Sequence, residues 1–198
     1  MSHSQADGLA VRKRRATHAR IAASAARLAG EQGVGNTTVD QIARDAEVAR
    51  ATFFRYFDSK ESAVAEGITG SWLTQVTEAI ARQPAHLPAK DALVAAFAEL
   101  ADQFPAHAGQ IRELAGLTRG SPALDAWTAQ TYHRYERAIA ELLAPRMSAG
   151  TERDPRPHLL AALAMASVRV SLDDWIRHGG DLPALIHRAL ESISVEPA

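Results

Sequence analysis

The sequence predicts an all-α fold of about nine helices. Apolar residues recur every three or four positions through most of the chain, the spacing that places them on one face of a helix. Capping residues and Gly or Pro stops separate these segments. We find neither the apolar and polar alternation of a strand nor an internal repeat. With 198 residues, 46% of them hydrophobic, the chain is long enough for a substantial core.

The first helix is predicted to begin near Ala16, where apolar residues start to recur at helical spacing. It is expected to end at Gly33, because glycine readily takes the left-handed conformation that terminates many helices. Residues 1–16 are small and polar, with a basic cluster at 12–15. We expect them to form a disordered, basic N-terminal arm.

A second helix is predicted from Val39, with Thr38 before it and Gln41 three residues after Thr38, in the arrangement of a capping box. A tight turn at Glu47-Val48-Ala49 leads to a basic and aromatic helix in the block 50–57. Two short helices joined in this way are typical of a helix-turn-helix. In such a unit the second helix enters the DNA major groove while the first braces against the backbone.

A fourth helix is predicted from Lys60 to about Ala81, capped by Ser59. Ser121 is expected to cap a later helix whose first residue is Pro122. The segment 145–157, rich in charge, Gly and Pro, is predicted to be a flexible loop. The remaining five helices, including the one that begins at Pro122, are expected near residues 91–103, 105–118, 122–142, 158–178 and 182–193.

Charge is unevenly distributed along the chain. Residues 1–60 hold 10 Lys and Arg against 6 Asp and Glu, whereas residues 61–198 hold 12 against 17. A basic head on an acidic body is expected if only the head contacts a polyanion such as DNA. The asymmetry is modest, so a distribution without functional meaning is the alternative.

Several classes of function are not supported by the sequence. The chain has no cysteine, which excludes disulfides and thiol chemistry. No apolar run approaches the roughly 20 residues that span a bilayer, and the N-terminus lacks an apolar signal-peptide centre. We therefore expect a cytoplasmic protein. No metal-binding histidine pair, Walker motif or dinucleotide motif is present, so a helical enzyme is only an alternative, and no cofactor is expected.

Residues 17–66 resemble the DNA-binding domain of the tetracycline-repressor (TetR) family of bacterial transcription regulators. The resemblance is carried by Thr37-Thr38-Val39, Ile42-Ala43, the Thr52-Phe53-Phe54-Arg55-Tyr56-Phe57 block and Ser59-Lys60-Glu61. It implies a DNA-binding domain over 17–62 and a helical domain over 63–198 that binds an effector and forms a homodimer.

The function implied by this resemblance is ligand-responsive regulation of transcription, with repression as the family default. The homodimer would bind a palindromic operator in double-stranded DNA and leave it when a small, largely apolar effector binds. A regulator of the same fold without a small-molecule effector, controlled by a protein partner, is the alternative.

Roles in DNA binding follow from residue chemistry and from the family positions. An arginine can contact guanine O6 and N7 together, and a Thr or Ala methyl can meet a thymine methyl. A helix N-terminus suits a phosphate. Base contacts are expected from Arg50, Ala51, Thr52 and Arg55, and phosphate contacts from Thr38, Tyr56 and Lys60. Solvated charges are the alternative for the two arginines.

The aromatic residues and the turn differ in their predicted roles. Phe53 and Phe57 are expected to pack inward. The resemblance places Phe54 where the family usually has a tyrosine whose hydroxyl binds a phosphate. Because this chain lacks that hydroxyl, Phe54 is also expected to be structural. The family turn usually reads Gly-Val-Ser, whereas this chain has Glu47 and Ala49 at the outer positions. Each change should cost up to about 1 kcal/mol through backbone strain or a lost cap. The basic cluster at 12–15 either follows the DNA or is a solvated tail.

The C-terminal domain offers two further sets of candidate residues. An effector cavity, apolar with a few polar groups, is predicted to be lined by Phe97, Leu100, Phe104, Trp127, Tyr132, Met165, Val168 and Arg169. Ordinary core packing is the alternative for each of them, and a salt bridge to Asp173 is the alternative for Arg169. The dimer interface is predicted at Leu172, Trp175, Ile176, Leu182, Leu185, Ile186 and Ile193, with burial inside the chain as the alternative.

Overall fold

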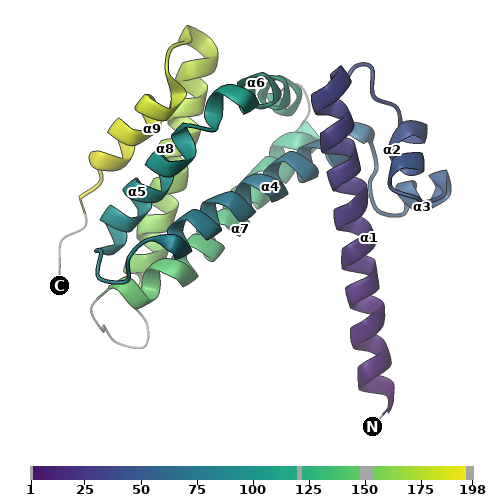
Figure 1. Cartoon of the computed structure of the whole chain (residues 1–198), viewed down its shortest axis with the longest axis horizontal. Helices are drawn as coiled ribbons and strands as arrows, with labels where there is room; N and C mark the ends of the chain where they lie inside the picture. Colours follow the sequence, from purple (N-terminus) through teal and green to yellow (C-terminus); the bar gives the residue numbers. More distant parts are fainter. Residues whose placement is uncertain (1, 120–121, 148–153, 195–198) are drawn as a thin grey trace. The chain divides into compact units, whose positions relative to one another are not determined.

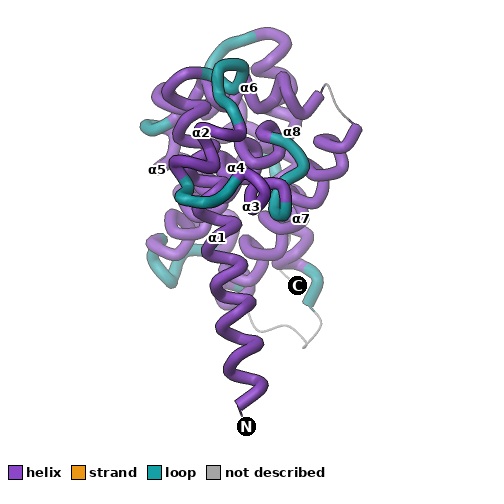
Figure 2. The backbone as a smooth tube through the Cα atoms, turned by 90° about the vertical axis from the view of Figure 1, so that its right-hand side faces the viewer, coloured by secondary structure: helices purple, strands orange, loops and turns teal. Residues whose placement is uncertain are grey.

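A computed structural model describes residues 2–119, 122–147 and 154–194. Figure 2 shows helices joined by short loops, and these ranges contain no strand, which confirms the predicted all-α class. Nine α-helices and one 3-10 helix run through them (Figure 1): α1 Ser2–Gln32, α2 Val39–Asp45, α3 Arg50–Phe54, α4 Lys60–Arg82, α5 Ala89–Ala101, α6 Phe104–Arg119, α7 Pro122–Leu143, η1 Ala144–Arg146, α8 Arg156–His178 and α9 Leu182–Glu191. None of these helices is both long and apolar enough to cross a membrane.

The predicted stop at Gly33 and the predicted Ser59 cap are both present, and similar signals end α8 and start α9. Gly33 has a φ of 83° directly after α1, and Gly179 has a φ of 78° directly after α8. Asp181 caps α9 by accepting a hydrogen bond from the backbone N–H of Ala184 at 3.1 Å. Ser59 caps α4 in the same way, through the N–H of Ser62 at 3.1 Å. Each of these signals involves only neighbouring residues, so it can be predicted from the sequence alone.

The start of α1 differs from the prediction. The helix begins at Ser2 rather than near Ala16, so the structure continues the helix through the arm that the sequence led us to expect as disordered. Residues 2–15 contain no proline and are rich in Ala, Gln, Leu, Arg and Lys, which are good helix formers. The side chains of 11–16 are exposed, which explains why an apolar pattern did not mark this segment as a helix.

The predicted loop at 145–157 is shorter than expected. Its first residues form η1, and α8 already begins at Arg156. Residues 148–153 and the predicted cap Ser121 lie outside the described residues. Arg146 in η1 donates three hydrogen bonds to the last carbonyls of the α4 region, those of Ile80, Gln83 and Pro84, at 2.6–3.1 Å. Part of the predicted loop therefore caps a helix.

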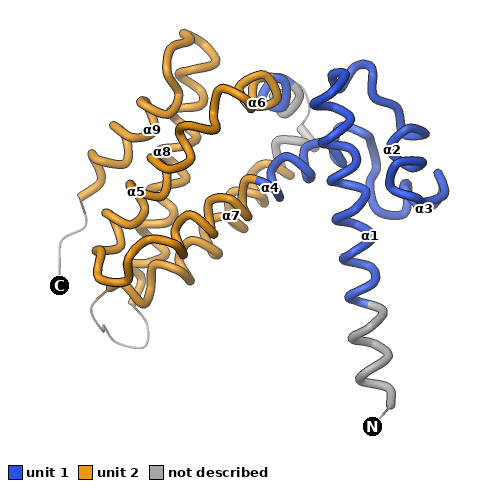
Figure 3. Tube along the Cα trace, in the orientation of Figure 1, with its two compact units in different colours: residues 1–71, 113–117 blue, residues 72–112, 118–198 orange. Residues whose placement is uncertain are grey.

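The chain divides into two compact units (Figure 3). Unit 1 comprises residues 1–71 and 113–117, and unit 2 comprises 72–112 and 118–198. In unit 1, α1 and α4 approach closely, since a Cβ at Gly67 would collide with the carbonyl oxygen of Ala22 and lie 2.7 Å from the Cβ of Ala26. Any side chain at position 67 would push these helices apart.

Unit 2 has a separate apolar core in which α7, α8 and α9 pack together and α5 packs on α9. Its fully buried side chains include Ile80, Leu93, Ile139, Leu143, Leu160 and Leu190.

Candidate nucleic-acid interface

The capping box predicted for α2 is present. The hydroxyl of Thr38 accepts a hydrogen bond from the backbone N–H of Gln41 at 3.2 Å, and the Gln41 side chain accepts one from the N–H of Thr38 at 2.8 Å. Thr38 is exposed, and its hydroxyl also donates a hydrogen bond to Oε1 of Gln41 at 3.0 Å. The N–H groups of Val39 and Asp40, in the first turn, are donors that the helix itself does not satisfy. This is the geometry in which a helix start can hold a phosphate.

The turn between α2 and α3 has the two departures read from the sequence. Glu47 has a φ of 52°, the left-handed conformation that glycine takes without strain. Ala49 is the N-cap of α3, with a ψ of 148° and no side-chain hydrogen bond. Helix α1 braces this turn, because Nε of Arg20 donates a hydrogen bond to the carbonyl of Ala46 at 2.8 Å.

Helix α3 buries one face and exposes the other. Phe53 is completely buried and Phe57 nearly so, as predicted. Phe54 is 46% exposed, and its ring meets that of Phe53 edge to face at 5.3 Å between centroids, so its structural role stays a prediction. Consecutive residues on a helix point about 100° apart, so Phe53 and Phe54 cannot both face the core.

The exposed face of α3 carries the predicted base-reading residues. Arg50, Ala51 and Arg55 are exposed, and Thr52 is half-buried. Nη1 of Arg50 forms an ion pair with Oδ1 of Asp40, on α2, at 2.6 Å. The Arg50 guanidinium also lies 5.4 Å from the centroid of the Phe54 ring. Asp40 and Phe54 are therefore parts of this surface that the sequence did not assign to it.

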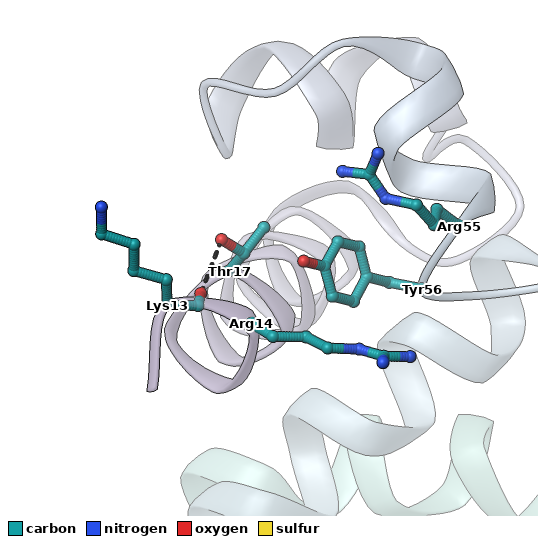
Figure 4. A pocket seen from close by; sticks show the side chains of 5 residues that line it. All are labelled: Lys13, Arg14, Thr17, Arg55 and Tyr56. Atoms are coloured by element: carbon teal, nitrogen blue, oxygen red, sulfur yellow. Dashed lines mark hydrogen bonds between the residues drawn. The ribbon is translucent and has the colours of Figure 1, made fainter. Parts of the chain in front are cut away.

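A basic groove of about 390 Å³ lies between α1 and the end of α3, lined by Lys13, Arg14, Thr17, Arg55 and Tyr56 (Figure 4). The Arg55 guanidinium lies 5.6 Å from the centroid of the Tyr56 ring, and Figure 4 shows the ring between the Arg14 and Arg55 side chains. Two arginines flank the Tyr56 hydroxyl here, while the Lys13 side chain extends away from the ring in Figure 4 and the Thr17 hydroxyl donates to the Lys13 carbonyl at 3.0 Å. Paired arginines beside a hydroxyl group suit a phosphate group. The sequence marked four of these five residues but not Thr17.

The Lys60 side chain lies differently from the prediction. Its ammonium group donates hydrogen bonds to the carbonyls of Val34 and Thr37, each at 2.8 Å, and to that of Gly35 at 3.3 Å. These bonds fix the segment between α1 and α2, and they occupy the Lys60 ammonium group that was predicted to contact a phosphate. Any phosphate contact by this side chain has to compete with them, whereas its backbone N–H remains at the start of α4.

Helix α6 also contributes to the same segment. The carboxylate of Glu113 accepts a hydrogen bond from the backbone N–H of Val34 at 2.7 Å. Residues 113–117 belong to unit 1, and the earlier part of α6 belongs to unit 2. Glu113 is 79 positions from Val34 in the sequence, so no local pattern could have identified it.

An ion pair ties α1 to the end of α2. Arg27 binds both Asp45 and Glu31. Hydrogen bonds from the Arg27 guanidinium and, secondarily, the Ser24 hydroxyl lower the pKa of Asp45 below its ordinary value of 3.8. All of these residues belong to unit 1, so the pair links α1 to the first helix of the helix-turn-helix.

Five of the eight predicted effector-lining residues lie in or against the core of unit 2. Leu100 and Met165 are buried in it, and Phe97, Tyr132 and Val168 pack against it. Phe104 meets Trp175 edge to face at 5.4 Å between ring centroids, and Trp127 is half-buried. Arg169 is exposed, and its place in an effector cavity stays a prediction.

The predicted dimer residues divide by burial. Trp175, Leu182 and Ile193 are buried by their own chain, as the alternative for this set predicted. Trp175 also stacks with Arg112, 4.2 Å from the ring centroid, and donates to the carbonyl of Gly180. The other four predicted residues, Leu172, Ile176, Leu185 and Ile186, are half-buried. The most exposed apolar side chains of α8 were not predicted: Leu159, Leu163 and Val170.

A basic, exposed second helix braced by a capped first helix defines a helix-turn-helix DNA-binding protein. Comparison with known protein families agrees with this class. Residues 21–66 match the family described as bacterial regulatory proteins, tetR family, and residues 87–196 match the MftR C-terminal domain.

Two curated relatives cover most of the chain. The HTH-type transcriptional regulator TcmR of Streptomyces glaucescens is 31% identical over 96% of this chain and 88% of its own length. A Mycobacterium tuberculosis protein, named as a candidate mycofactocin biosynthesis transcriptional regulator, MftR, is 28% identical over 84% of this chain and 83% of its own. The chain belongs to the TetR family of bacterial transcriptional regulators, and its class is that of regulators, not enzymes.

Solved structures share the fold. Thermus thermophilus FadR, a TetR-family repressor in complex with lauroyl-CoA, has a TM-score of 0.64 and 21% identity, covering 91% of this chain and 98% of its own. RolR in complex with resorcinol has a TM-score of 0.56 and 19% identity, covering 94% and 91%.

Proposed function

We propose that this regulator is a ligand-responsive repressor that binds a palindromic operator as a homodimer and is released by a small, largely apolar effector. The observation that carries the DNA-binding part is the exposed, basic face of α3 next to the capped start of α2. The other parts follow from features of unit 2 and from the family.

On the operator, Arg50, Ala51, Thr52 and Arg55 contact base edges in the major groove. Arginine in this position favours guanine, and the Ala and Thr methyl groups favour thymine. Phosphates flank these bases. Thr38 and the N–H groups at the start of α2 hold one of them, as does the backbone N–H of Lys60 at the start of α4.

The groove between α1 and Tyr56 holds another phosphate. Lys13 and Arg14 line this groove from α1, and Arg55 lines it from the residue after α3. The double substitution Lys13→Ala and Arg14→Ala should reduce the magnitude of the slope of log K against log salt by about 0.9, the contribution of one phosphate contact. An unchanged slope rules out this role, and exposed Arg137→Ala in α7 is the matched control.

Dimerisation uses the exposed apolar side chains of α8, with the half-buried residues of α9 beside them. Leu159, Leu163 and Val170 follow one another at helical spacing and are exposed within their own chain. A dimer would place two copies of α3 roughly 34–36 Å apart, in successive major grooves. Sedimentation at micromolar concentration should give a dimer, and Leu163→Glu a monomer. A wild-type monomer would contradict this proposal.

The effector binds between the helices of unit 2, near the partly buried Phe97, Tyr132 and Val168. It acts by binding more tightly to a state of the dimer that does not fit the operator. The ligands of two fold neighbours, lauroyl-CoA and resorcinol, are the first compounds to titrate against the DNA complex. If no protein-free fraction of a cell extract releases the DNA, control by a protein partner is favoured instead.

The DNA-binding function is tested by selection of genomic fragments on the full-length protein. We expect a few fragments that share a palindromic site, together with loss of this enrichment for Thr52→Ala combined with Arg55→Ala. Arg137→Ala, far from α3 in the sequence, should retain it. Recovery of fragments without a shared site would contradict operator recognition.

A further inference from the structure

We propose that Phe54 and Arg50 together read a thymine and a guanine at neighbouring base pairs of each half-site, with Asp40 positioning Arg50. This inference rests on the proposed function, because it specifies what the exposed face of α3 recognises.

The first observation is the exposure of Phe54. It is the only aromatic side chain among the strongly exposed hydrophobic residues of the part of the chain that the structure describes. A phenylalanine has no hydroxyl for a phosphate and cannot make hydrogen bonds to a base edge. It can contact the C5 methyl group of thymine, the one apolar group that the major groove displays. Its exposed ring therefore has a defined target on DNA.

The second observation is that Arg50 shares this face of α3. Residues four apart lie one above the other on a helix, and the guanidinium lies 5.4 Å from the centroid of the Phe54 ring. Successive base pairs are stacked about 3.4 Å apart. Groups this close reach adjacent rather than distant base pairs. Arginine is the side chain that contacts guanine O6 and N7 together, so the neighbouring base is assigned as guanine.

The third observation is the ion pair between Arg50 and Asp40. The carboxylate of Asp40, on α2, binds Nη1 of Arg50 at 2.6 Å, and both side chains are mostly exposed. This geometry uses one edge of the guanidinium and leaves Nη2 and Nε for a guanine. An arginine held in place before binding loses less conformational freedom when it docks. Asp40 is thus a positioning residue that acts through Arg50.

The test begins with selection from a random duplex library, using the full-length wild type, Phe54→Ala and Arg50→Lys. The wild type should select half-sites with thymine next to guanine. Phe54→Ala should lose the thymine preference and keep the guanine, whereas Arg50→Lys should lose the guanine preference by at least tenfold and keep the thymine. Asp40→Asn should weaken the guanine preference only.

A second test then isolates the contact between Phe54 and the thymine methyl group. Replacing the selected thymine by deoxyuridine removes only its C5 methyl group. The wild type should bind the deoxyuridine duplex roughly fourfold more weakly, the equivalent of one buried methyl group, and Phe54→Ala should bind both duplexes equally. Phe54→Leu, which keeps an apolar side chain, should retain part of the difference. A merely structural Phe54 would weaken binding to both duplexes without changing their ratio.

The outcomes separate this inference from the function on which it rests. If the wild type selects a motif but Phe54→Ala keeps its thymine preference and its sensitivity to deoxyuridine, the inference is overturned and operator binding stands. If the wild type selects no motif, operator recognition itself fails, and the inference fails with it.

Discussion

The carboxylate of Glu113 on α6 accepts a hydrogen bond from the backbone N–H of Val34, 2.7 Å away, just beyond the end of α1. The same segment is also held by the Lys60 ammonium, which donates hydrogen bonds to the carbonyls of Val34 and Thr37. This segment leads directly into Thr38, the cap of α2. Glu113 and Lys60 therefore set the position from which α2 starts.

Removing the acceptor at position 113 should weaken DNA binding. Glu113→Ala leaves the N–H of Val34 without its partner and loosens the approach to Thr38, so we expect the Kd for the operator to rise roughly fivefold, about 1 kcal/mol. Glu113→Gln keeps an acceptor oxygen and should restore most of the affinity. Fluorescence anisotropy on a selected duplex measures both variants. Equal affinities for Glu113→Ala and the wild type would show that this bond does not support α2.

The strained turn gives a prediction on stability. Glu47 has a φ of 52°, a conformation that costs an L-residue roughly 1 kcal/mol or more. Glu47→Gly should therefore raise the free energy of unfolding by about 1 kcal/mol, measured by denaturant titration followed by circular dichroism. The matched control is Ala23→Gly at an exposed position inside α1, which should lower it by about 1 kcal/mol. A loss of stability on Glu47→Gly would contradict the strain.

The uncapped start of α3 gives a second prediction on stability. Ala49 is the N-cap, but its methyl group cannot accept a hydrogen bond. Ala49→Ser should stabilise the protein by roughly 0.5–2 kcal/mol and raise the melting temperature. Ala51→Ser, inside the first turn of α3, offers no cap and should not stabilise the protein. If both serines had the same effect, the gain could not be attributed to capping.

The ion pair between Arg27 and Asp45 predicts a dependence of stability on pH. Because Arg27 lowers the pKa of Asp45 in the folded protein, the unfolded chain takes up the proton first as the pH falls. The stabilisation is complete above the ordinary pKa of 3.8 and is lost as the pH falls through the lower folded value. The difference in unfolding free energy between the wild type and Asp45→Asn should shrink over that range. Arg27→Gln should remove the same acid dependence, and a difference that is constant with pH would exclude the pair as its source.

The parts of the fold that the sequence predicts well depend on neighbouring residues only. The Thr38 and Gln41 capping box, the stop at Gly33 and the Ser59 cap each lie within one helical turn. The start of α1 could not be predicted in this way, since residues 2–15 have no apolar stripe. The exposure of Phe54 could not be predicted either, because it depends on which other elements pack against α3 and not on a local signal such as a cap.

The candidate site shows the same division. Periodicity and residue type identify α3 and its exposed arginines, but they do not show what a long side chain touches. Lys60 has the chemistry of a phosphate ligand and instead binds three backbone carbonyls, because the α1 to α2 segment folds over the start of α4. Glu113 and Asp40 act through partners 79 and 10 positions away. Only the folded chain brings these groups together.

The most direct test of operator binding by paired copies of α3 is a hydroxyl-radical footprint on one fragment recovered by genomic selection. We expect two protected patches on one face of the duplex, with centres about 10 base pairs apart, placed symmetrically about the palindrome. Arg55→Ala should weaken both patches equally, because each copy of the chain contributes one. A single protected patch, or uniform protection unrelated to the palindrome, would contradict this mode of binding.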